Sequence, residues 1–186
     1  MSGVVIQNMS FKVGQTLTVT GVPTADSTNF AINIGHSPDE ITLHMNPRFD
    51  AHGDQQCVVC NSYQGGNWFE EQRESSFPFN QNEEFKIKIT FTNEEFLMTL
   101  SDGSEIHFPN RLGAEKYKFM LFEGEMQLSL CLLVTRILLW YCFSTTRGSK
   151  TTVNCHELCS YINHFQRWLT LSNQDYLQVS FSTYFL

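Results

Sequence analysis

Three hydrogen-bonding side chains occupy alternate positions in the segment from residue 44 to residue 48, namely His44, Asn46 and Arg48. In a β-strand, residues i, i+2 and i+4 lie on the same face. The segment therefore predicts a row on one face made of an imidazole, an amide and a guanidinium. Such a row is either a recognition surface or a solvated face of a sheet.

A second group of side chains lies about twenty residues further on. Glu71 and Arg73 are again two residues apart, which predicts one shared face of a later strand, and Trp68 would add an aromatic plane. Taken one at a time, these residues have ordinary alternatives. Trp68 could be part of the core, Glu71 and Arg73 a solvated ion pair, and His44 a structural histidine.

The elements that must position these residues are short strands separated by turns. Eleven segments before residue 133 are predicted to be strands, with the clearest alternation of apolar and polar residues at 85–91. They are residues 4–11, 17–21, 30–34, 41–48, 57–61, 68–74, 85–91, 96–100, 106–108, 117–121 and 126–130. The pattern predicts an all-β, two-sheet antiparallel β-sandwich of jelly-roll type. Pro47 has no N–H group, so it predicts an edge position or an irregularity within its strand.

Length and charge limit the possible functions. The chain has 186 residues, 41% of them hydrophobic and 17% charged, which is enough for one globular domain and an extension. Residues 1–133 carry 8 basic and 17 acidic side chains, whereas residues 134–186 carry 4 and 2. An acidic domain without a concentrated basic patch argues against nucleic acid as a partner.

The sequence pattern changes after residue 133, so we divide the chain into a domain at 1–133 and a hydrophobic tail at 134–186. The 16 residues from Leu128 to Phe143 are too few for a membrane span, which needs about 20, and Arg136 interrupts them. They favour a buried or aggregating segment. Residues 144–152 predict a loose polar linker, and apolar residues at helical spacing between 158 and 169 predict a helix. The tail is therefore expected to be irregular or partly helical.

The sequence predicts no metal and no cofactor. The N-terminus has no basic leader and no apolar signal-peptide core, so we expect synthesis in the cytosol with reduced cysteines. Cys57 and Cys60 form a CxxC pattern, but in a strand the two thiols point to opposite faces, which favours structural thiols. Cys155, His156 and Cys159 lack a second pair of ligands.

Residues 4–133 resemble a galectin, a β-galactoside-binding lectin, of the prototype kind with a single carbohydrate-recognition domain. Six motifs and their spacing carry the resemblance, namely His-Met-Asn-Pro-Arg-Phe at 44–49, Ala-His-Gly-Asp at 51–54, Val-Cys-Asn-Ser at 59–62, Trp-Phe-Glu-Glu-Gln-Arg at 68–73, Phe-Pro-Phe at 77–79 and Phe-Pro-Asn-Arg-Leu-Gly at 108–113. Galectins usually carry Gly where this chain has Phe69, and Phe where it has Met45. The atypical tail contains no second set of these motifs.

The resemblance implies a role for each residue of a carbohydrate-binding site. Three residues, His44, Asn46 and Arg48, would bind the axial O4 hydroxyl of galactose. Trp68 would stack on the apolar face of the sugar, and Asn61 and Glu71 would bind the O6 side. Arg73 and the loop after Arg48 would reach the second sugar, and an ionic network would join Arg48, Glu71 and Arg73. The implied site is His44, Asn46, Arg48, His52, Asp54, Asn61, Trp68, Glu71 and Arg73.

The predicted function is non-enzymatic binding of glycoproteins and glycolipids that end in β-galactosides such as lactose or N-acetyllactosamine. A glycosidase needs two carboxyl groups, one of them a proton donor, and Glu71 between two arginines makes a poor acid. The alternative is a galectin-fold interaction or membrane-associated protein whose tail weakens or abolishes sugar binding. The resemblance also implies a homodimer, which the tail could block, and an extracellular location reached by unconventional export.

Overall fold

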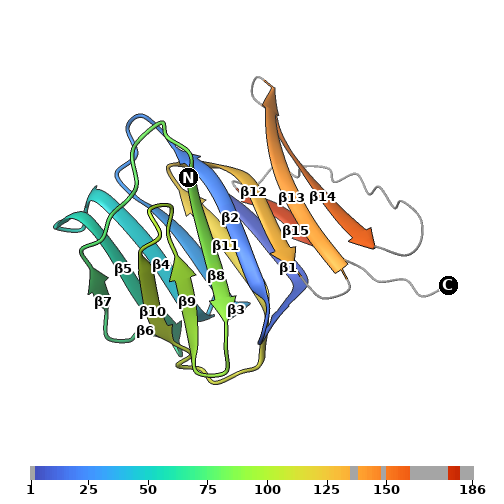
Figure 1. The fold of residues 1–186 in the computed structure, drawn as a ribbon, viewed down its shortest axis with the longest axis horizontal. Helices are drawn as coiled ribbons and strands as arrows, with labels where there is room; N and C mark the ends of the chain where they lie inside the picture. Colours follow the sequence, from blue (N-terminus) through green and yellow to red (C-terminus); the bar gives the residue numbers. More distant parts are fainter. Residues whose placement is uncertain (1–2, 135–137, 148–149, 160–175, 181–186) are drawn as a thin grey trace.

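The predicted sandwich is confirmed. A computed structural model describes residues 3–134, 138–147, 150–159 and 176–180, and these residues form fifteen β-strands in two sheets (Figure 1). The first sheet has the order β15-β1-β11-β3-β4-β5-β6, and β7 also pairs with β5. Its strands are β1 (Gly3–Lys12), β3 (Phe30–Ser37), β4 (Glu40–Ala51), β5 (Asp54–Gln64), β6 (Asn67–Trp68), β7 (Gln72–Glu74), β11 (Lys116–Gly124) and β15 (Tyr176–Ser180).

The second sheet has the order β10-β9-β8-β2-β12-β13-β14. Its strands are β2 (Thr16–Pro23), β8 (Phe85–Phe91), β9 (Glu95–Thr99), β10 (Glu105–Pro109), β12 (Met126–Val134), β13 (Leu138–Arg147) and β14 (Lys150–Cys159). Strand β8 shows most clearly why the sequence folds this way. Phe85, Ile87, Ile89 and Phe91 are buried, whereas the lysines between them are exposed. The period of two therefore gives the sheet one apolar face and one solvated face.

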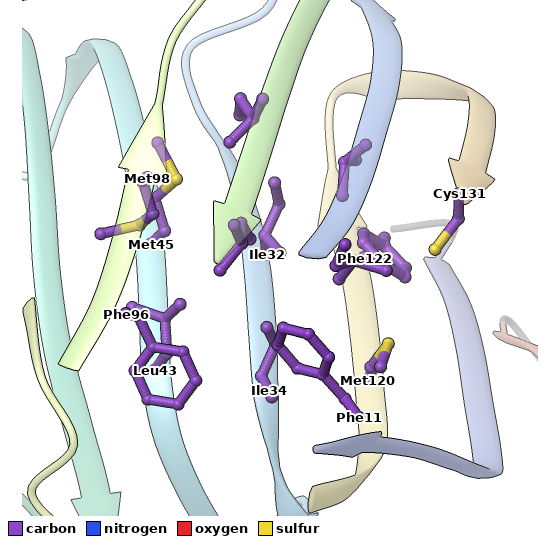
Figure 2. Close-up of a cluster of buried hydrophobic side chains, with 14 of the residues drawn as sticks. Phe11, Ile32, Ile34, Leu43, Met45, Phe96, Met98, Met120, Phe122 and Cys131 are labelled. Carbon is purple, nitrogen blue, oxygen red and sulfur yellow. The ribbon is translucent and has the colours of Figure 1, made fainter. Parts of the chain in front are cut away.

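The core lies between the two sheets and is rich in aromatic side chains (Figure 2). Phe30 of the first sheet stacks on Phe85 of the second at 4.8 Å between ring centroids. Phe91 and Phe96 stack at 4.6 Å. Met45, which replaces the usual galectin Phe, is fully buried among these side chains. The packed core holds β3, β4 and β5 rigidly, and these are the strands that carry the predicted polar row.

The described part of the tail is β-structure, which differs from the irregular conformation that we predicted. Strand β13 pairs with β12, β14 pairs with β13, and β15 lies parallel to β1. The expected loose linker at 144–152 instead contributes to the β13–β14 hairpin, because Ser144–Arg147 pair with Lys150–Val153. The first two residues of the helix predicted at 158–169 belong to β14, and the rest of that segment lies outside the described residues. Within the described ranges, no helix is long and apolar enough to cross a membrane.

Candidate functional site

The predicted row of three polar side chains lies on the central strand β4. Its register places His44 between Asn33 of β3 and Asn61 of β5. Asn46 and Arg48 are only 4% and 8% exposed, so their polar atoms need hydrogen-bond partners within the protein. All three side chains line one groove, which confirms that they share a face of the sheet.

Pro47 interrupts the β3–β4 pairing without lying at an edge. Strand β4 is flanked by β3 and β5, so the edge position predicted as one possibility for Pro47 is wrong. The other possibility, an irregularity within the strand, is confirmed by the interrupted pairing with β3.

Asn46 binds both the neighbouring strand and a neighbour in the polar row. Its side-chain amide donates to the Phe30 carbonyl at 2.6 Å, and its Oδ1 atom accepts from Arg48 Nε at 2.8 Å. Asn46 thus links strand β3 to the guanidinium of Arg48.

His44 is held in one tautomer by Asn33. The Asn33 Nδ2 atom donates to the Leu121 carbonyl at 3.3 Å and to a carboxylate oxygen of Glu123 at 3.0 Å, so its Oδ1 atom must face His44. This oxygen lies 2.6 Å from His44 Nδ1 and can only accept, so Nδ1 carries the hydrogen. In the neutral ring, Nε2 is then left as an acceptor.

Electrostatics keep His44 neutral. Burial lowers the pKa of His44 to about 4, and the positive charge of Arg48 and the nearby His52 add to this effect. His44 also lies 4.8 Å from the Trp68 ring, measured between centroids. At neutral pH the ring is therefore a hydrogen-bond acceptor with an aromatic neighbour, rather than a cation.

Arg48, Asp54, Glu71 and Arg73 form a closed ring of ion pairs. Arg48 contacts Asp54 at 2.5 Å and Glu71 at 3.6 Å, and Arg73 contacts Glu71 at 2.5 Å and Asp54 at 3.4 Å. The predicted ionic network is therefore present, with Asp54 as a fourth member. The hydrogen bond from Arg48 holds the pKa of Asp54 below its usual value, and Arg73 contributes in the same direction.

The turn between β4 and β5 brings Asp54 to Arg48. Ala51 pairs with Asp54, so His52 and Gly53 form a two-residue hairpin loop. Both have positive φ angles, 55° and 84°, as a type I′ turn requires. His52 lines the groove, whereas Asp54 is committed to the two arginines.

The single strand predicted at 68–74 is wrong, because the chain leaves the sheet between β6 and β7. After the bond from the Phe69 N–H to the Ser62 carbonyl, side chains bind the backbone carbonyls. Asn61 Nδ2 donates to the Phe69 carbonyl at 2.9 Å, and Arg111 Nη1 donates to the Glu70 carbonyl at 2.8 Å. Glu71 is therefore not on a strand, although it lies in the groove as predicted.

Trp68 is the aromatic wall of the groove. Its side chain is 51% exposed, so it is not a core residue, and Tyr63 supports it at 5.0 Å between ring centroids. The neighbouring Phe69 is also exposed, at 46%, but it does not line the groove. The bulky residue that replaces the usual galectin glycine thus points elsewhere and leaves the groove open.

The groove has a volume of about 560 Å³. Seven of the nine predicted residues line it, and the other two, Asp54 and Arg73, are joined to it by the ion pairs. Its remaining walls come from residues that the sequence reasoning did not assign. The full lining is Thr28, Asn29, Ala31, His44, Asn46, Arg48, His52, Asn61, Trp68, Glu71, Glu123, Gly124 and Glu125.

Two residues outside the groove support it and were missed. Asn33 orients His44, and Arg111 holds both Asn61 Oδ1, at 3.3 Å, and the Glu70 carbonyl. The only signal for Asn33 was a polar residue on the outward face of an apolar strand. Among the side chains that the structure describes, no group of three or more His, Cys, Asp or Glu residues could hold a metal ion.

Comparison with known proteins agrees with this geometry. The family model described as galactoside-binding lectin matches residues 3–132. The β-galactoside-binding lectin of Electrophorus electricus is 63% identical over 128 residues, which is 69% of this chain and 95% of that lectin.

Solved structures give the same result. The crystal structure of galectin-1-L2 from Dario rerio is 75% identical, with a TM-score of 0.68, over 68% of this chain and 96% of that one. CG-16, a homodimeric agglutinin from chicken liver, is 36% identical, with a TM-score of 0.69, over 72% and 100%. With the described fold and the intact groove motifs, these matches show that this chain belongs to the galactoside-binding lectin family, the galectins.

Proposed function

We propose that this chain is a non-catalytic lectin that binds terminal β-galactosides such as lactose and N-acetyllactosamine. One observation carries the proposal. The polar row, the exposed Trp68 and the ion-pair ring meet around a single groove that is large enough for a disaccharide. The similarity to the β-galactoside-binding lectin of Electrophorus electricus supports the same ligand class.

The axial O4 hydroxyl of galactose is the group that fits the polar row. A hydroxyl has one hydrogen to donate and two lone pairs to accept with. His44 Nε2 takes the hydrogen, and Arg48, which has only donors, supplies a hydrogen bond in return. Glucose carries this hydroxyl equatorially, so it would leave the buried row unpaired, which discriminates strongly against it.

The rest of the groove fits the other parts of the ligand. The exposed ring of Trp68 stacks on the apolar face of galactose. As the family resemblance implies, we assign Asn61 and Glu71 to the O6 side of galactose and His52 and Arg73 to the second sugar. Asn61, Glu71 and His52 line the groove, and Arg73 is joined to it through its ion pair with Glu71. Because both Asp54 oxygens are paired with arginines, we assign Asp54 to holding the guanidinium groups rather than to contacting the sugar.

The arrangement of carboxylates favours binding without catalysis. Glycoside hydrolysis needs a protonated carboxyl group beside the bond that breaks. Glu71 and Asp54 each bridge Arg48 and Arg73, and Glu123 accepts from Asn33, while Glu125 accepts from the backbone N–H and the side-chain hydroxyl of Thr28. Each carboxylate therefore serves as a hydrogen-bond acceptor, which suits recognition and not acid catalysis.

We further propose that the full chain presents one sugar site per molecule. The pairing of β15 with β1 and of β13 with β12 covers one edge of each sheet, which would otherwise be free to pair with a second copy. At the right of Figure 1, strands β13 and β14, in orange, extend the sandwich beyond β12. We therefore do not expect the full chain to form a homodimer, unlike CG-16, the homodimeric agglutinin from chicken liver.

Calorimetric titration with lactose and with cellobiose tests the proposed ligand. The two disaccharides differ only in the configuration at C4 of the non-reducing sugar. We expect saturable binding of lactose, none of cellobiose, and a loss of lactose binding in Trp68→Ala, while the variant keeps the wild-type circular dichroism spectrum. Equal responses to the two sugars, or no response to lactose, would refute the proposal.

A further inference from the structure

One backbone hydrogen bond is missing from the β3–β4 ladder, at Pro47. The pairs Ile32 with Met45 and Asn29 with Arg48 fix a register in which Pro47 lies opposite Phe30. The Phe49 N–H donates to the Thr28 carbonyl at 2.8 Å, and in an antiparallel ladder such bonds recur every second residue. The next donor along β4 would be the N–H of residue 47, which proline lacks.

The Phe30 carbonyl, which receives no backbone hydrogen bond from residue 47, accepts one from a side chain of the groove. The Phe30 carbonyl, which would accept from an N–H at position 47, accepts from the Asn46 side-chain amide at 2.6 Å. The same amide nitrogen is 3.3 Å from Asn29 Oδ1. With its nitrogen committed to β3, the Asn46 side chain must turn its oxygen toward Arg48, whose Nε lies 2.8 Å away.

We propose that Pro47 is a positioning residue of the sugar site, and that it acts by leaving the Phe30 carbonyl free for Asn46. Any other residue at position 47 would bring an N–H group that competes for this carbonyl and weakens its hydrogen bond to the Asn46 amide. Asn46 would then no longer hold the guanidinium of Arg48 at a fixed angle. The effect on sugar binding rests on the proposed function, whereas the hydrogen-bond exchange is a property of the protein alone.

The first experiment compares Pro47→Ala with Pro38→Ala. Pro38 lies in the exposed β3–β4 turn, so its replacement controls for the loss of a proline in the unfolded chain. We expect Pro47→Ala to weaken lactose binding roughly five- to tenfold, as for the loss of one oriented hydrogen bond. Its urea midpoint should be no lower than that of Pro38→Ala, because both variants lose a proline in the unfolded chain and only Pro47→Ala gains a ladder bond. Pro38→Ala should bind lactose as the wild type does.

The second experiment is a double-mutant cycle that needs no ligand. Asn46→Ala leaves the Phe30 carbonyl without its side-chain donor, and Pro47→Ala in that background supplies a backbone donor. We therefore expect Pro47→Ala to raise the urea midpoint of the Asn46→Ala protein more than it raises that of wild type. The new amide at position 47 should also be protected from hydrogen exchange.

The outcomes distinguish the positioning role of Pro47 from the proposed binding of lactose. Additive effects of the two substitutions and an unprotected amide at position 47 would overturn the positioning role. So would wild-type affinity for lactose in Pro47→Ala. If wild-type protein fails to bind lactose while the cycle shows coupling and protection, the proposed ligand is wrong but the exchange between Asn46 and residue 47 stands.

Discussion

The Nδ1 atom of His44 lies 2.6 Å from the Oδ1 atom of Asn33, a buried residue that does not line the groove. Because the Asn33 amide is oriented by Leu121 and Glu123, this contact decides which nitrogen of His44 faces the ligand with a lone pair. The recognition of one hydroxyl thus depends on a hydrogen-bond chain that crosses strands β4, β3 and β11.

Replacing Asn33 with Ala should release the tautomer of His44. We expect about tenfold weaker binding of lactose, because the O4 hydroxyl then meets a mixture of donor and acceptor rings. Asn33→Asp keeps an acceptor at Nδ1 and should retain the tautomer. Nitrogen-15 NMR of the His44 ring in the free protein is the direct measurement.

The control for Asn33→Ala is Asn110→Ala, which removes another buried amide. Asn110 binds the Tyr117 hydroxyl and two backbone carbonyls, and it does not line the groove. We expect it to lower stability without changing the His44 ring spectrum. An unchanged His44 tautomer in Asn33→Ala would contradict the assignment.

The depressed pKa of His44 predicts the dependence of stability on pH. The pKa is about 4 in the folded protein and about 6.5 in the unfolded chain, so the unfolded chain binds more protons between these values. The free energy of unfolding should therefore fall as the pH drops from 6.5 toward 4, by about 2–3 kcal/mol at pH 4.5. Urea unfolding at a series of pH values measures this slope.

A His44→Gln variant supplies the comparison, since glutamine does not titrate. Its stability should depend less on pH in this window than that of wild type, and identical slopes would argue against a depressed pKa. In the wild type, His44 stays neutral down to about pH 5.5, so we expect the affinity for lactose to be constant between pH 7.5 and 5.5.

The ring of ion pairs predicts that replacing its buried and its exposed members will lower stability by different amounts. Asp54→Asn removes the negative charge paired with the buried guanidinium of Arg48, so it should lower the urea midpoint and weaken lactose binding. Arg73→Ala should lower the urea midpoint less than Asp54→Asn does, because the Arg73 side chain is half exposed and its ion pairs are screened by solvent. Asp50→Asn is the matched control, because Asp50 is an exposed carboxylate on β4, the strand that carries Arg48. Chemical denaturation that ranked Arg73→Ala as the worse variant would refute this order.

Most of the fold was predictable from the period of two in the apolar residues. Strand β8 illustrates this, because each predicted inward residue is buried and both lysines are exposed. The groove was predictable because His44, Asn46 and Arg48 alternate on one strand, so their shared face follows from strand geometry. The meeting of this face with Trp68 and Glu71 came from the spacing of the family motifs.

Features that depend on hydrogen bonds between residues far apart in the chain could not be predicted from the local sequence pattern. The break between β6 and β7 depends on Arg111, which is 41 residues from the Glu70 carbonyl that it binds. The role of Asn33 depends on Leu121, a partner 88 residues away. In the tail, local composition suggested a loose linker at 144–152, whereas pairing across the β13–β14 hairpin places strands there.

Removing residues 135–186 should convert the protein into a dimer that crosslinks glycans. The Electrophorus electricus lectin, which this chain matches over 95% of its length, indicates that the remaining domain folds alone. Without the tail, β1 and β12 lose β15 and β13, and exposed strand edges favour pairing in a symmetric dimer. We expect light scattering to give a monomer for the full chain and a dimer for the truncated one, with equal lactose affinity per chain. Only the truncated protein should agglutinate red blood cells, and a full-length dimer that agglutinates them would show that these edges are not covered in solution.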